Sequence, residues 1–266
     1  MLINLDGRKI YYDLNGPDDG PTICFTHSLS SDGGMWAEQL PGLLAEGYRV
    51  LRLDMRGHGG SDPVAGDYTM TDLADDVAAS LDALGIDKVQ FVGLSIGGMI
   101  GQAFAIKYPG RLISAMLCDT MPATPDGADA AWGPRLKAVR EANDVTVLAD
   151  GTMERWFTDA YKPRNPARWK QIRETIAGTT PAGYLGCGAA ILNFDFRDDH
   201  KNIKTPTLVV CGDQDEGTPP AGNKLIAESI PGGRYEEIAD ARHFPNVEHP
   251  DVFNGIMMPW LAQHRG

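Results

Sequence analysis

The stretch "GLSIG", residues 93–97, constrains the fold of this chain more than any other. The run "KVQFVG" is apolar enough for a buried strand, and the following "IGGMIGQAFAIKY" has helical spacing. Ser95 is therefore predicted at a sharp strand-to-helix turn, where crowding explains a glycine two positions before and after it. Such a turn strains its central residue, and the first amides of the next helix favour a developing anion. The pattern predicts a nucleophilic serine. A purely structural turn is the alternative, because glycine is common here (31 residues).

Short apolar runs alternate with longer amphipathic segments through most of the chain. An opening hairpin is expected to turn at Asp6-Gly7. Strands are predicted at residues 2–5, 8–14, 22–27, 49–54, 88–93, 112–119, 205–213 and 234–239. Helices are predicted at Met35–Glu46, Thr71–Leu84, 96–107, Asn223–Ser229 and Asp251–His264. This alternation predicts an α/β fold with a mostly parallel, eight-stranded sheet flanked by helices.

The alternation stops between Met121 and about Lys201, where prolines and helical segments rich in Trp, Tyr and Arg replace it. We interpret residues 121–201 as a helical lid inserted between two strands, over the edge of the sheet where α/β proteins bind ligands. Residues 1–120 and 202–266 then form the core.

A serine nucleophile needs a base, and the base needs an orienting acid. His243 follows the last predicted strand and precedes the last helix, so its loop can bring the imidazole over Ser95. His27 and His58 are interpreted as structural residues of loops. The other histidines lie in the lid or near the last helix, at positions 200, 249 and 264.

Three aspartates compete for the role of the acid. Asp215 follows the strand "TLVVC" at the carboxyl edge of the sheet. The chain order Ser95, Asp215, His243 fits that of hydrolases whose serine lies at such a strand-to-helix turn. Asp119 ends the preceding strand and is the alternative position, whereas Asp213 is more typical of a turn cap. We predict Asp215.

A tetrahedral intermediate needs two hydrogen-bond donors for its oxyanion. One is expected to be the amide of Ile96, directly after the nucleophile. The other is expected in the loop after the third strand, where the Leu29 amide is the best candidate. The side chains of His27 and Ser28 would then shape that loop.

Composition excludes several other classes of protein. The net charge of −12 and the pI of about 4.9 argue against a nucleic-acid surface.

The uncharged run Val89–Ile106 is crowded by glycines and is better explained by a strand, turn and buried helix than by a membrane span. The N-terminus lacks the apolar region of a signal peptide. Four cysteines without metal-type spacing are typical of buried thiols in a cytoplasmic protein. No metal or cofactor is implied, and the oligomeric state is left open.

Nearly the whole chain resembles the α/β-hydrolase fold superfamily, and within it the 3-oxoadipate enol-lactonases and allied small carboxylesterases. The matching motifs are "HSLSSDGGMW", "RVLRLDMRGHGGSD", "YTMTDLADDVAASLDALGIDKVQFVGLSIGGMIGQAFAIKYPGRL", "GDQDEGTPP" and "HFPNVEHP". The resemblance implies the roles of nucleophile, acid and base for Ser95, Asp215 and His243. Two positions depart from the pattern: His27 stands where enol-lactonases often have Asn, and Glu216 where proline is common.

The motifs together indicate a serine hydrolase that cleaves a carboxylic ester or lactone, with a small molecule as its partner. The alternatives are a general carboxylesterase or perhydrolase, a carbon–carbon bond hydrolase, and a ligand receptor with slow turnover. An enol-lactone substrate would carry a free carboxylate, which an arginine of the lid could bind. The candidates for substrate contact are Trp132, Arg135 and Trp156, and the lid also offers Arg140, Arg164, Arg168 and Trp169. The alternative is that these are surface arginines and packing tryptophans.

Overall fold

A central sheet organises the computed structural model, which describes residues 1–265. Its strands lie in the order β1-β2-β4-β3-β5-β6-β7-β8; β1–β2 and β2–β4 pair antiparallel, and all other neighbours pair parallel. The predicted eight-stranded, mostly parallel sheet is confirmed. The strands are β1 (Leu2–Leu5), β2 (Arg8–Asn15), β3 (Thr22–Thr26), β4 (Arg49–Leu53), β5 (Val89–Leu94), β6 (Leu112–Cys118), β7 (Thr207–Gly212) and β8 (Arg234–Ile238).

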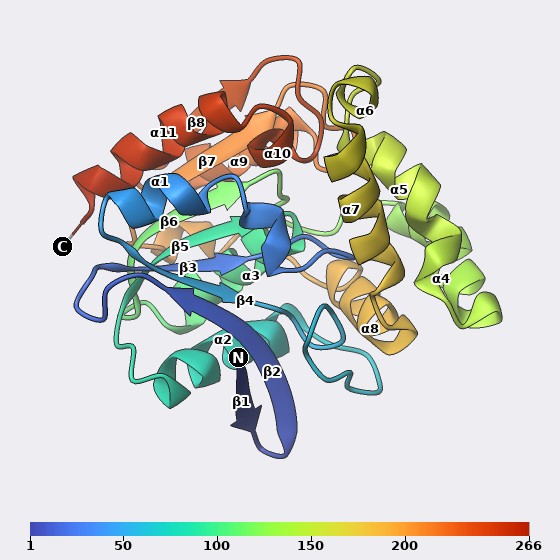
Figure 1. The fold of residues 1–266 in the computed structure, drawn as a ribbon, viewed down its shortest axis with the longest axis horizontal. Helices are drawn as coiled ribbons and strands as arrows, with labels where there is room; N and C mark the ends of the chain where they lie inside the picture. Colours follow the sequence, from blue (N-terminus) through green and yellow to red (C-terminus); the bar gives the residue numbers. More distant parts are fainter. Residues whose placement is uncertain (266) are drawn as a thin grey trace.

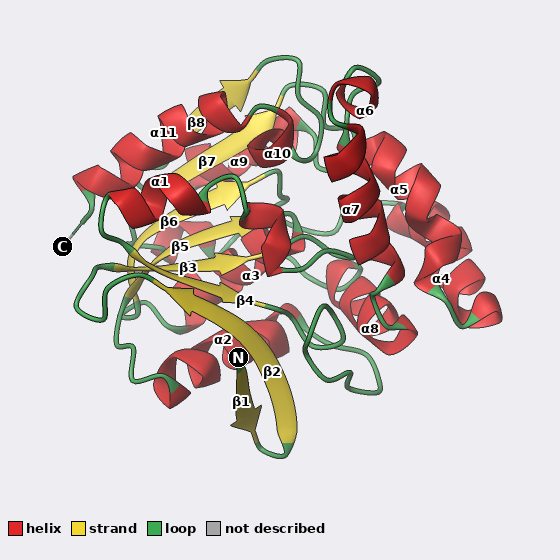
Figure 2. Ribbon diagram, in the orientation of Figure 1, coloured by secondary structure: helices red, strands yellow, loops and turns green. Residues whose placement is uncertain are grey.

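Helices cover both faces of the sheet (Figures 1 and 2). Helices α1 and α11 lie on one face, whereas α2, α3 and α9 lie on the other, where α3 packs on β5 and β6. Every residue of β3, β5 and β7 is buried, which is why these strands are mostly apolar in sequence rather than alternating. The core helices are η1 (Gly33–Trp36), α1 (Leu40–Ala45), α2 (Met70–Ala83), α3 (Ile96–Lys107), α9 (Pro220–Ser229), α10 (Pro245–Glu248) and α11 (Pro250–Gln263).

Local sequence signals explain several boundaries. Asp6 and Gly7 both have positive φ (51° and 90°), as a two-residue hairpin turn between β1 and β2 requires. Helix α2 begins after Thr69, whose side chain accepts a hydrogen bond from the Asp72 amide while the Asp72 carboxylate accepts one from the Thr69 amide. This reciprocal pair is a capping box, and it fixes the start of the helix.

One predicted helix is wrong in extent. The segment Met35–Glu46 is divided into the 3-10 turn η1 and the short helix α1. Pro41 has no amide hydrogen to donate to the preceding turn, so a helix can begin beside it but cannot run through it from Met35. Asp32 instead caps η1, accepting a hydrogen bond from the Gly34 amide at 2.7 Å.

Residues 121–201, which we call the lid segment, connect β6 to β7. They contribute no strand to the sheet in the described chain, and an isolated bridge pairs Ala123 with Asp195 near the two ends of the segment. Figure 1 shows the lid helices gathered at one side of the sheet. They are α4 (Ala128–Ala142), η2 (Val145–Leu148), α5 (Ala149–Trp156), α6 (Tyr161–Arg164), α7 (Pro166–Ala177) and α8 (Pro181–Ile191), followed by η3 (His200–Asn202).

The strand order reverses between β3 and β5, since the chain runs from β3 outward to β4 and then returns to the other side of β3. In open α/β sheets the crevice at the carboxyl ends of two such strands is the usual binding site. The loop after β3 and the turn after β5 meet at this point. The topology therefore places the Leu29 loop beside Ser95.

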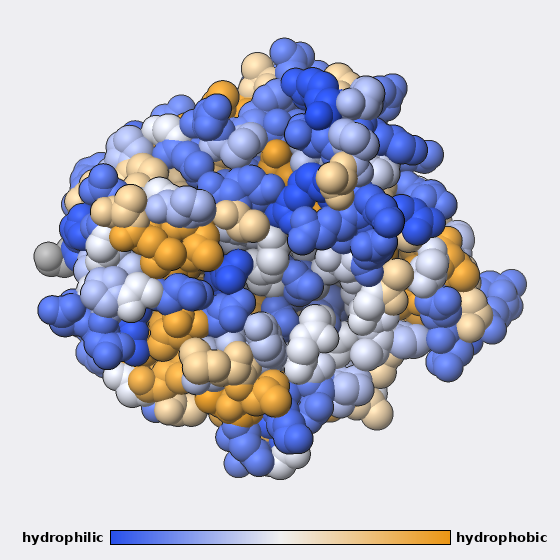
Figure 3. All heavy atoms as spheres, viewed as in Figure 1, coloured by the Kyte–Doolittle hydropathy of each residue, from blue (hydrophilic) through white to orange (hydrophobic). Residues whose placement is uncertain are grey.

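The surface shows no broad apolar area in the view of Figure 3, where apolar side chains form separate patches among hydrophilic ones. The exposed large hydrophobic residues of the described chain belong to different elements: Met1, Leu2, Val147, Leu225 and Val252. No helix within residues 1–265 combines the length and hydropathy that crossing a membrane requires.

The close packing of α3 on the sheet leads to a prediction about stability. A Cβ on Gly101 would lie 2.6 Å from the Phe91 ring and 2.8 Å from the Leu117 side chain. Gly101→Ala is therefore expected to lower the free energy of unfolding by about 1–3 kcal/mol, because the core must shift to admit the methyl group. Urea denaturation measures the change.

The matched control is Gly255→Ala in α11, where a Cβ would have nothing within 4 Å. This variant is expected to keep or raise the stability, by up to about 1 kcal/mol, since alanine favours a helix over glycine. Equal effects of the two substitutions would contradict the packing described for α3.

Candidate active site

Ser95 occupies the turn between β5 and α3 in a strained backbone conformation, with φ 61° and ψ −121°. Its amide donates a hydrogen bond to the Cys118 carbonyl at 2.9 Å. A Cβ on Gly93 would lie 2.3 Å from the Gly97 carbonyl oxygen, and a Cβ on Gly97 would lie 2.6 Å from that of Thr26. The strand, the turn and the helix thus approach so closely that only glycine fits on either side of the serine.

His243 and Asp215 form a hydrogen-bonded pair at the carboxyl edge of the sheet. The His243 Nδ1 donates to Asp215 Oδ2 at 2.7 Å, and the Thr218 hydroxyl donates to the same oxygen. The amides of Gly217 and Thr218 donate to Asp215 Oδ1 at 2.8 and 3.1 Å. Burial acts to raise the pKa of Asp215, but the charge of His243 and the bonds from His243 and Thr218 outweigh it and lower that pKa. Asp215 is therefore an ionised acceptor that orients the imidazole.

The other two candidate acids are placed differently. Asp213 is exposed and accepts a hydrogen bond from the Ala241 amide at 3.3 Å. Asp119 is fully buried and accepts one from the Gly212 amide at 2.9 Å. One oxygen of Asp119, one of Asp215 and one ring nitrogen of His243 lie within 4.8 Å of one another, a spacing that a cation could also use. Since His243 and Asp215 already bond each other, the arrangement is better described as an acid and a base.

The remaining histidines hold loops and helix ends. The His27 ring donates from Nδ1 to the Ser28 carbonyl at 2.8 Å and accepts at Nε2 from the Met55 amide at 2.9 Å, which fixes the loop after β3. His58, His200, His249 and His264 each bond a backbone carbonyl or an amide side chain. Within residues 1–265, His243 is the one histidine bonded to a carboxylate.

The two predicted oxyanion donors are buried at the carboxyl ends of β3 and β5. Leu29 is 9% exposed and Ile96 is 0% exposed. Ile96 is the first residue of α3, so no earlier turn of the helix can accept its hydrogen bond. Neither amide has an acceptor among the described protein groups. Because buried amides are almost always paired, two free ones beside a serine are suited to bind an anion.

The His243 loop is attached directly to the lid segment. The Phe244 amide donates to the Trp156 carbonyl at 3.1 Å, and the two rings stack with their centroids 4.1 Å apart. Arg242 donates to the Phe157 carbonyl at 3.0 Å. Glu248, which is 5% exposed, accepts hydrogen bonds from the Thr158 amide and hydroxyl and from the Arg242 amide. The lid segment therefore helps to hold the imidazole in place.

A cavity of about 480 Å³ lies between the sheet edge and the lid segment, and Ser95, Asp215 and His243 all line it. The predicted substrate contacts Trp132, Arg135 and Trp156 line it as well. Its remaining lining residues include Ser28, Leu29, Met99, Met121, Asp126, Thr152, Arg155, Tyr184, Ile191, Glu216 and Thr218. This volume is typical of a site for a small molecule.

Two arginines enter this cavity from neighbouring lid helices. Arg135 lies over the Trp132 ring, 5.6 Å from its centroid, and Arg155 donates to the Thr152 hydroxyl at 3.0 Å. Neither forms an ion pair with a carboxylate of residues 1–265. Burial, and secondarily the charge of Arg135, lower the pKa of Arg155. The pair is thus a half-buried positive site.

Arg155 is not among the residues predicted from the sequence, because its spacing does not separate it from the other arginines of the lid. Of those others, Arg168 is committed elsewhere: its Nε donates to Glu38 at 2.7 Å, and it also bonds the Gly34 carbonyl. Arg140 and Arg164 are exposed and outside the cavity lining. Trp169 packs on Phe157 rather than in the cavity, with ring centroids 5.7 Å apart.

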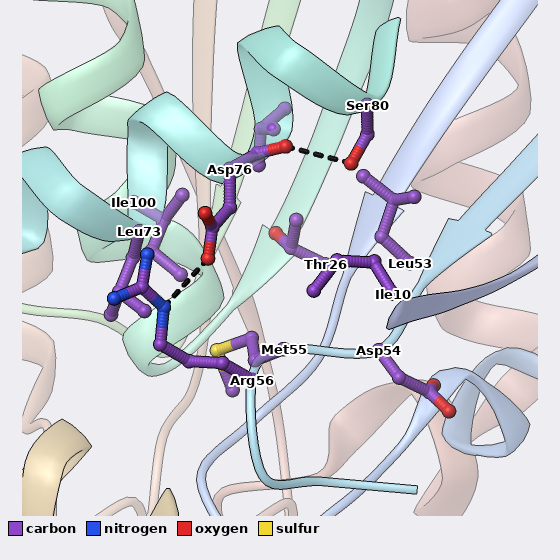
Figure 4. Close-up of a pocket in the computed structure, with 11 residues that line it drawn as sticks. Ile10, Thr26, Leu53, Asp54, Met55, Arg56, Leu73, Asp76, Ser80 and Ile100 are labelled. Carbon is purple, nitrogen blue, oxygen red and sulfur yellow. Dashed lines mark hydrogen bonds and ion pairs between the residues drawn. The ribbon is translucent and has the colours of Figure 1, made fainter. Parts of the chain in front are cut away.

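A second, much smaller cavity lies between the sheet and α2, with room for about one water (20 Å³). Figure 4 shows Arg56 reaching Asp76 beside it, and the Ser80 hydroxyl reaching back along the helix to the same residue. Arg8 also pairs with Asp76. The Asp76 carboxylate is thus paired with two arginines, and we interpret this cavity as structural.

The buried histidines lead to a prediction about acid stability. Burial lowers the pKa of His200 to about 4 and that of His58 to about 3, with the neighbouring His27 adding to the second shift. Below the unfolded pKa of about 6.5 the unfolded chain binds these protons and the native one does not, so the unfolding free energy falls as the pH drops toward 4. Each such histidine contributes a slope of up to about 1.4 kcal/mol per pH unit.

His200→Gln preserves a donor to Gln102 Oε1, which His200 Nε2 contacts at 2.8 Å, and removes the titration. The variant is expected to show a shallower loss of stability between about pH 6.5 and 4 than the wild type. Urea denaturation at several pH values measures this slope. An unchanged slope would show that His200 titrates alike in the native and unfolded states.

Comparison with known proteins places the chain in a family. A profile for the alpha/beta hydrolase fold matches residues 21–250. A 3-oxoadipate enol-lactonase of Acinetobacter baylyi is 34% identical over 95% of this chain and 93% of that protein. A bifunctional esterase/perhydrolase of Acinetobacter calcoaceticus is 31% identical over 96% and 97%. The solved enol-lactonase of Burkholderia xenovorans LB400 superposes with a TM-score of 0.94 at 34% identity, covering 98% of this chain and 100% of the other. The chain therefore belongs to the α/β-hydrolase fold family, as its motifs predict.

Proposed function

We propose that this hydrolase cleaves a carboxylic ester or lactone through an acyl-enzyme on Ser95, with 3-oxoadipate enol-lactone or a close relative as its substrate. The observation that carries the proposal is the Asp215–His243 hydrogen bond of 2.7 Å, in a pair that lines the same cavity as the strained serine. A serine held this way, with an imidazole oriented by a carboxylate, is suited to acyl transfer.

The reaction begins when Ser95 Oγ attacks the carbonyl carbon and His243 Nε2 takes the hydroxyl proton. Asp215 stabilises the imidazolium that forms and stays ionised. The tetrahedral oxyanion accepts hydrogen bonds from the Leu29 and Ile96 amides, which have no other acceptor among residues 1–265. Because both donors belong to the backbone, they need little reorganisation as the charge develops.

Collapse of the intermediate breaks the bond to the leaving oxygen, and His243 returns its proton to that oxygen. With an enol-lactone the leaving group is an enol, which tautomerises to a ketone and leaves more readily than an alkoxide. Water then attacks the acyl-enzyme while His243 takes its proton; the bond to Ser95 Oγ breaks, His243 returns the proton to that oxygen, and the product acid is released.

The substrate class is inferred from the two arginines. Arg135 and Arg155 supply unpaired positive charge at the part of the cavity that Trp132, Trp156 and Tyr184 also line, which favours a substrate with a free carboxylate. Two 34% identical relatives support this choice, one named as a 3-oxoadipate enol-lactonase and the other solved as an enol-lactonase. The relative named as a bifunctional esterase/perhydrolase supports simple esters as the second candidate.

The proposal is tested by steady-state hydrolysis of 3-oxoadipate enol-lactone beside p-nitrophenyl acetate and butyrate. We expect a kcat/KM for the lactone far above those for the two esters. Ser95→Ala is expected to lower kcat by about 10⁴-fold or more on every substrate, because the nucleophile is lost. Ester hydrolysis without lactone preference would favour the second candidate, and full activity of Ser95→Ala would refute the nucleophile.

The arginine pair is tested by Arg155→Gln and Arg135→Gln. Each is expected to raise KM for the lactone about tenfold or more, since a charge-assisted hydrogen bond to a carboxylate is worth about 1.5–3 kcal/mol. The kinetics on p-nitrophenyl acetate, which has no carboxylate, should change little. Arg140→Gln, an exposed position in the same helix as Arg135, is the matched control. An equal loss on both substrates would contradict carboxylate recognition.

A further inference from the structure

Asp119 is a buried acid that the proposed mechanism does not use. It follows β6 with a φ of 43° and is 0% exposed. Its amide donates to the Val210 carbonyl at 2.8 Å, and its Oδ1 accepts from the Gly212 amide at 2.9 Å. A left-handed conformation is uncommon outside glycine, although Asp and Asn tolerate it best. The side chain is thus held firmly between two strands of the sheet.

The second oxygen of Asp119 has no N–H or O–H donor among residues 1–265; the Cys211 thiol, a weak donor, lies beside the carboxyl group and acts to lower its pKa. Its acidic neighbour is Asp215: oxygens of the two carboxyl groups lie within 4.8 Å of each other and of a His243 ring nitrogen. A buried carboxylate oxygen without a donor is costly, and two ionised carboxylates at this spacing repel each other strongly. Both difficulties disappear if the Asp119 oxygen carries a proton.

We propose that Asp119 is a neutral carboxylic acid whose Oδ2 proton is donated to the Asp215 carboxylate, which makes Asp119 a positioning residue for the triad. The inference rests on the proposed function, in which Asp215 orients the base. The proton is assigned to Asp119 because Asp215 already receives hydrogen bonds from His243, from Thr218 and from the Gly217 amide. Those donors favour a negative charge on Asp215.

The electrostatics of the site agree with this assignment. Burial, and next the charge of Asp215, raise the pKa of Asp119 well above its ordinary value, whereas that of Asp215 is lowered. The other titratable groups around Asp119 are Cys118, Cys211 and Tyr235, whose pKa values burial raises. These neighbours are therefore neutral near pH 7, so the cluster holds a single negative charge beneath His243.

A single charge suits the base. One carboxylate orients His243 and stabilises the imidazolium, whereas a second would favour the protonated ring before the substrate arrives. The Asp119 proton also adds a fifth hydrogen-bond donor to the four that already surround the Asp215 carboxylate, and it limits rotation of that side chain.

The discriminating variant is Asp119→Asn. Asparagine tolerates the positive φ, its oxygen can accept from the Gly212 amide, and its NH₂ can donate to Asp215 as a permanently neutral group. Asp119→Gly removes the side chain without straining the backbone and leaves Asp215 without this donor. We expect the glycine variant to lower kcat about tenfold with KM nearly unchanged, and the asparagine variant to recover kcat to within about threefold of the wild type.

The pH profile separates a neutral from an ionised Asp119. For Asp119→Asn the apparent pKa on the acid side of kcat/KM should match the wild type, because no charge is removed. A decrease of about one unit would mean that Asp119 is ionised in the native enzyme, and it would overturn the proposal. Wild-type kcat in Asp119→Gly would equally overturn the positioning role.

Infrared spectroscopy gives a readout that does not depend on turnover. The difference spectrum of wild type minus Asp119→Asn at neutral pH should contain the C=O stretch of a buried protonated carboxylic acid. Its absence would refute the neutral acid whatever the activity. Conversely, an active Ser95→Ala variant would refute the proposed function while leaving this band in place, so the two failures are distinguishable.

Discussion

The close approach of three backbone segments is the constraint on which the rest of this structure depends. The end of β3, the Ser95 turn and the start of α3 pack so tightly that a Cβ on Gly97 would lie 2.6 Å from the Thr26 carbonyl oxygen. This contact joins the Ser95 turn to the loop after β3, so Ser95 and the Leu29 amide share one rigid support. Helix α3, packed on β5 and β6, in turn holds the strained turn in place.

The charged groups of the site differ in how deeply they are buried and in whether they have partners. The buried charge of Asp215 is stabilised by hydrogen bonds from His243, Thr218 and the Gly217 amide. The arginines Arg135 and Arg155 keep their charge unpaired, and they face the cavity. Under the proposed function, the end of the cavity at Ser95 would stabilise a developing oxyanion and the lid end would bind a carboxylate.

The lid segment has two roles in this arrangement. Trp156 lines the cavity and also stacks on Phe244, the residue after His243, with ring centroids 4.1 Å apart. Glu248 joins Thr158 of the lid segment to the Arg242 amide. The contacts that shape the cavity thus also hold the His243 loop, so the shape of the cavity and the position of the imidazole are coupled.

The sequence by itself determined the sheet, the elbow and the order of Ser95, Asp215 and His243, because strand and helix periodicities and paired glycines are local signals. It did not separate Arg155 from Arg168, since ion pairing with Glu38 depends on residues 130 positions apart. The helix predicted over Met35–Glu46 is divided at Pro41, and this boundary is a local signal that the sequence contains. From the sequence, Asp119 is an alternative to Asp215 for the role of the acid. The packing of β6 beside β7 shows instead that the two carboxyl groups lie close together. Tertiary structure decided these points because burial and charge pairing depend on neighbours that are remote in the chain.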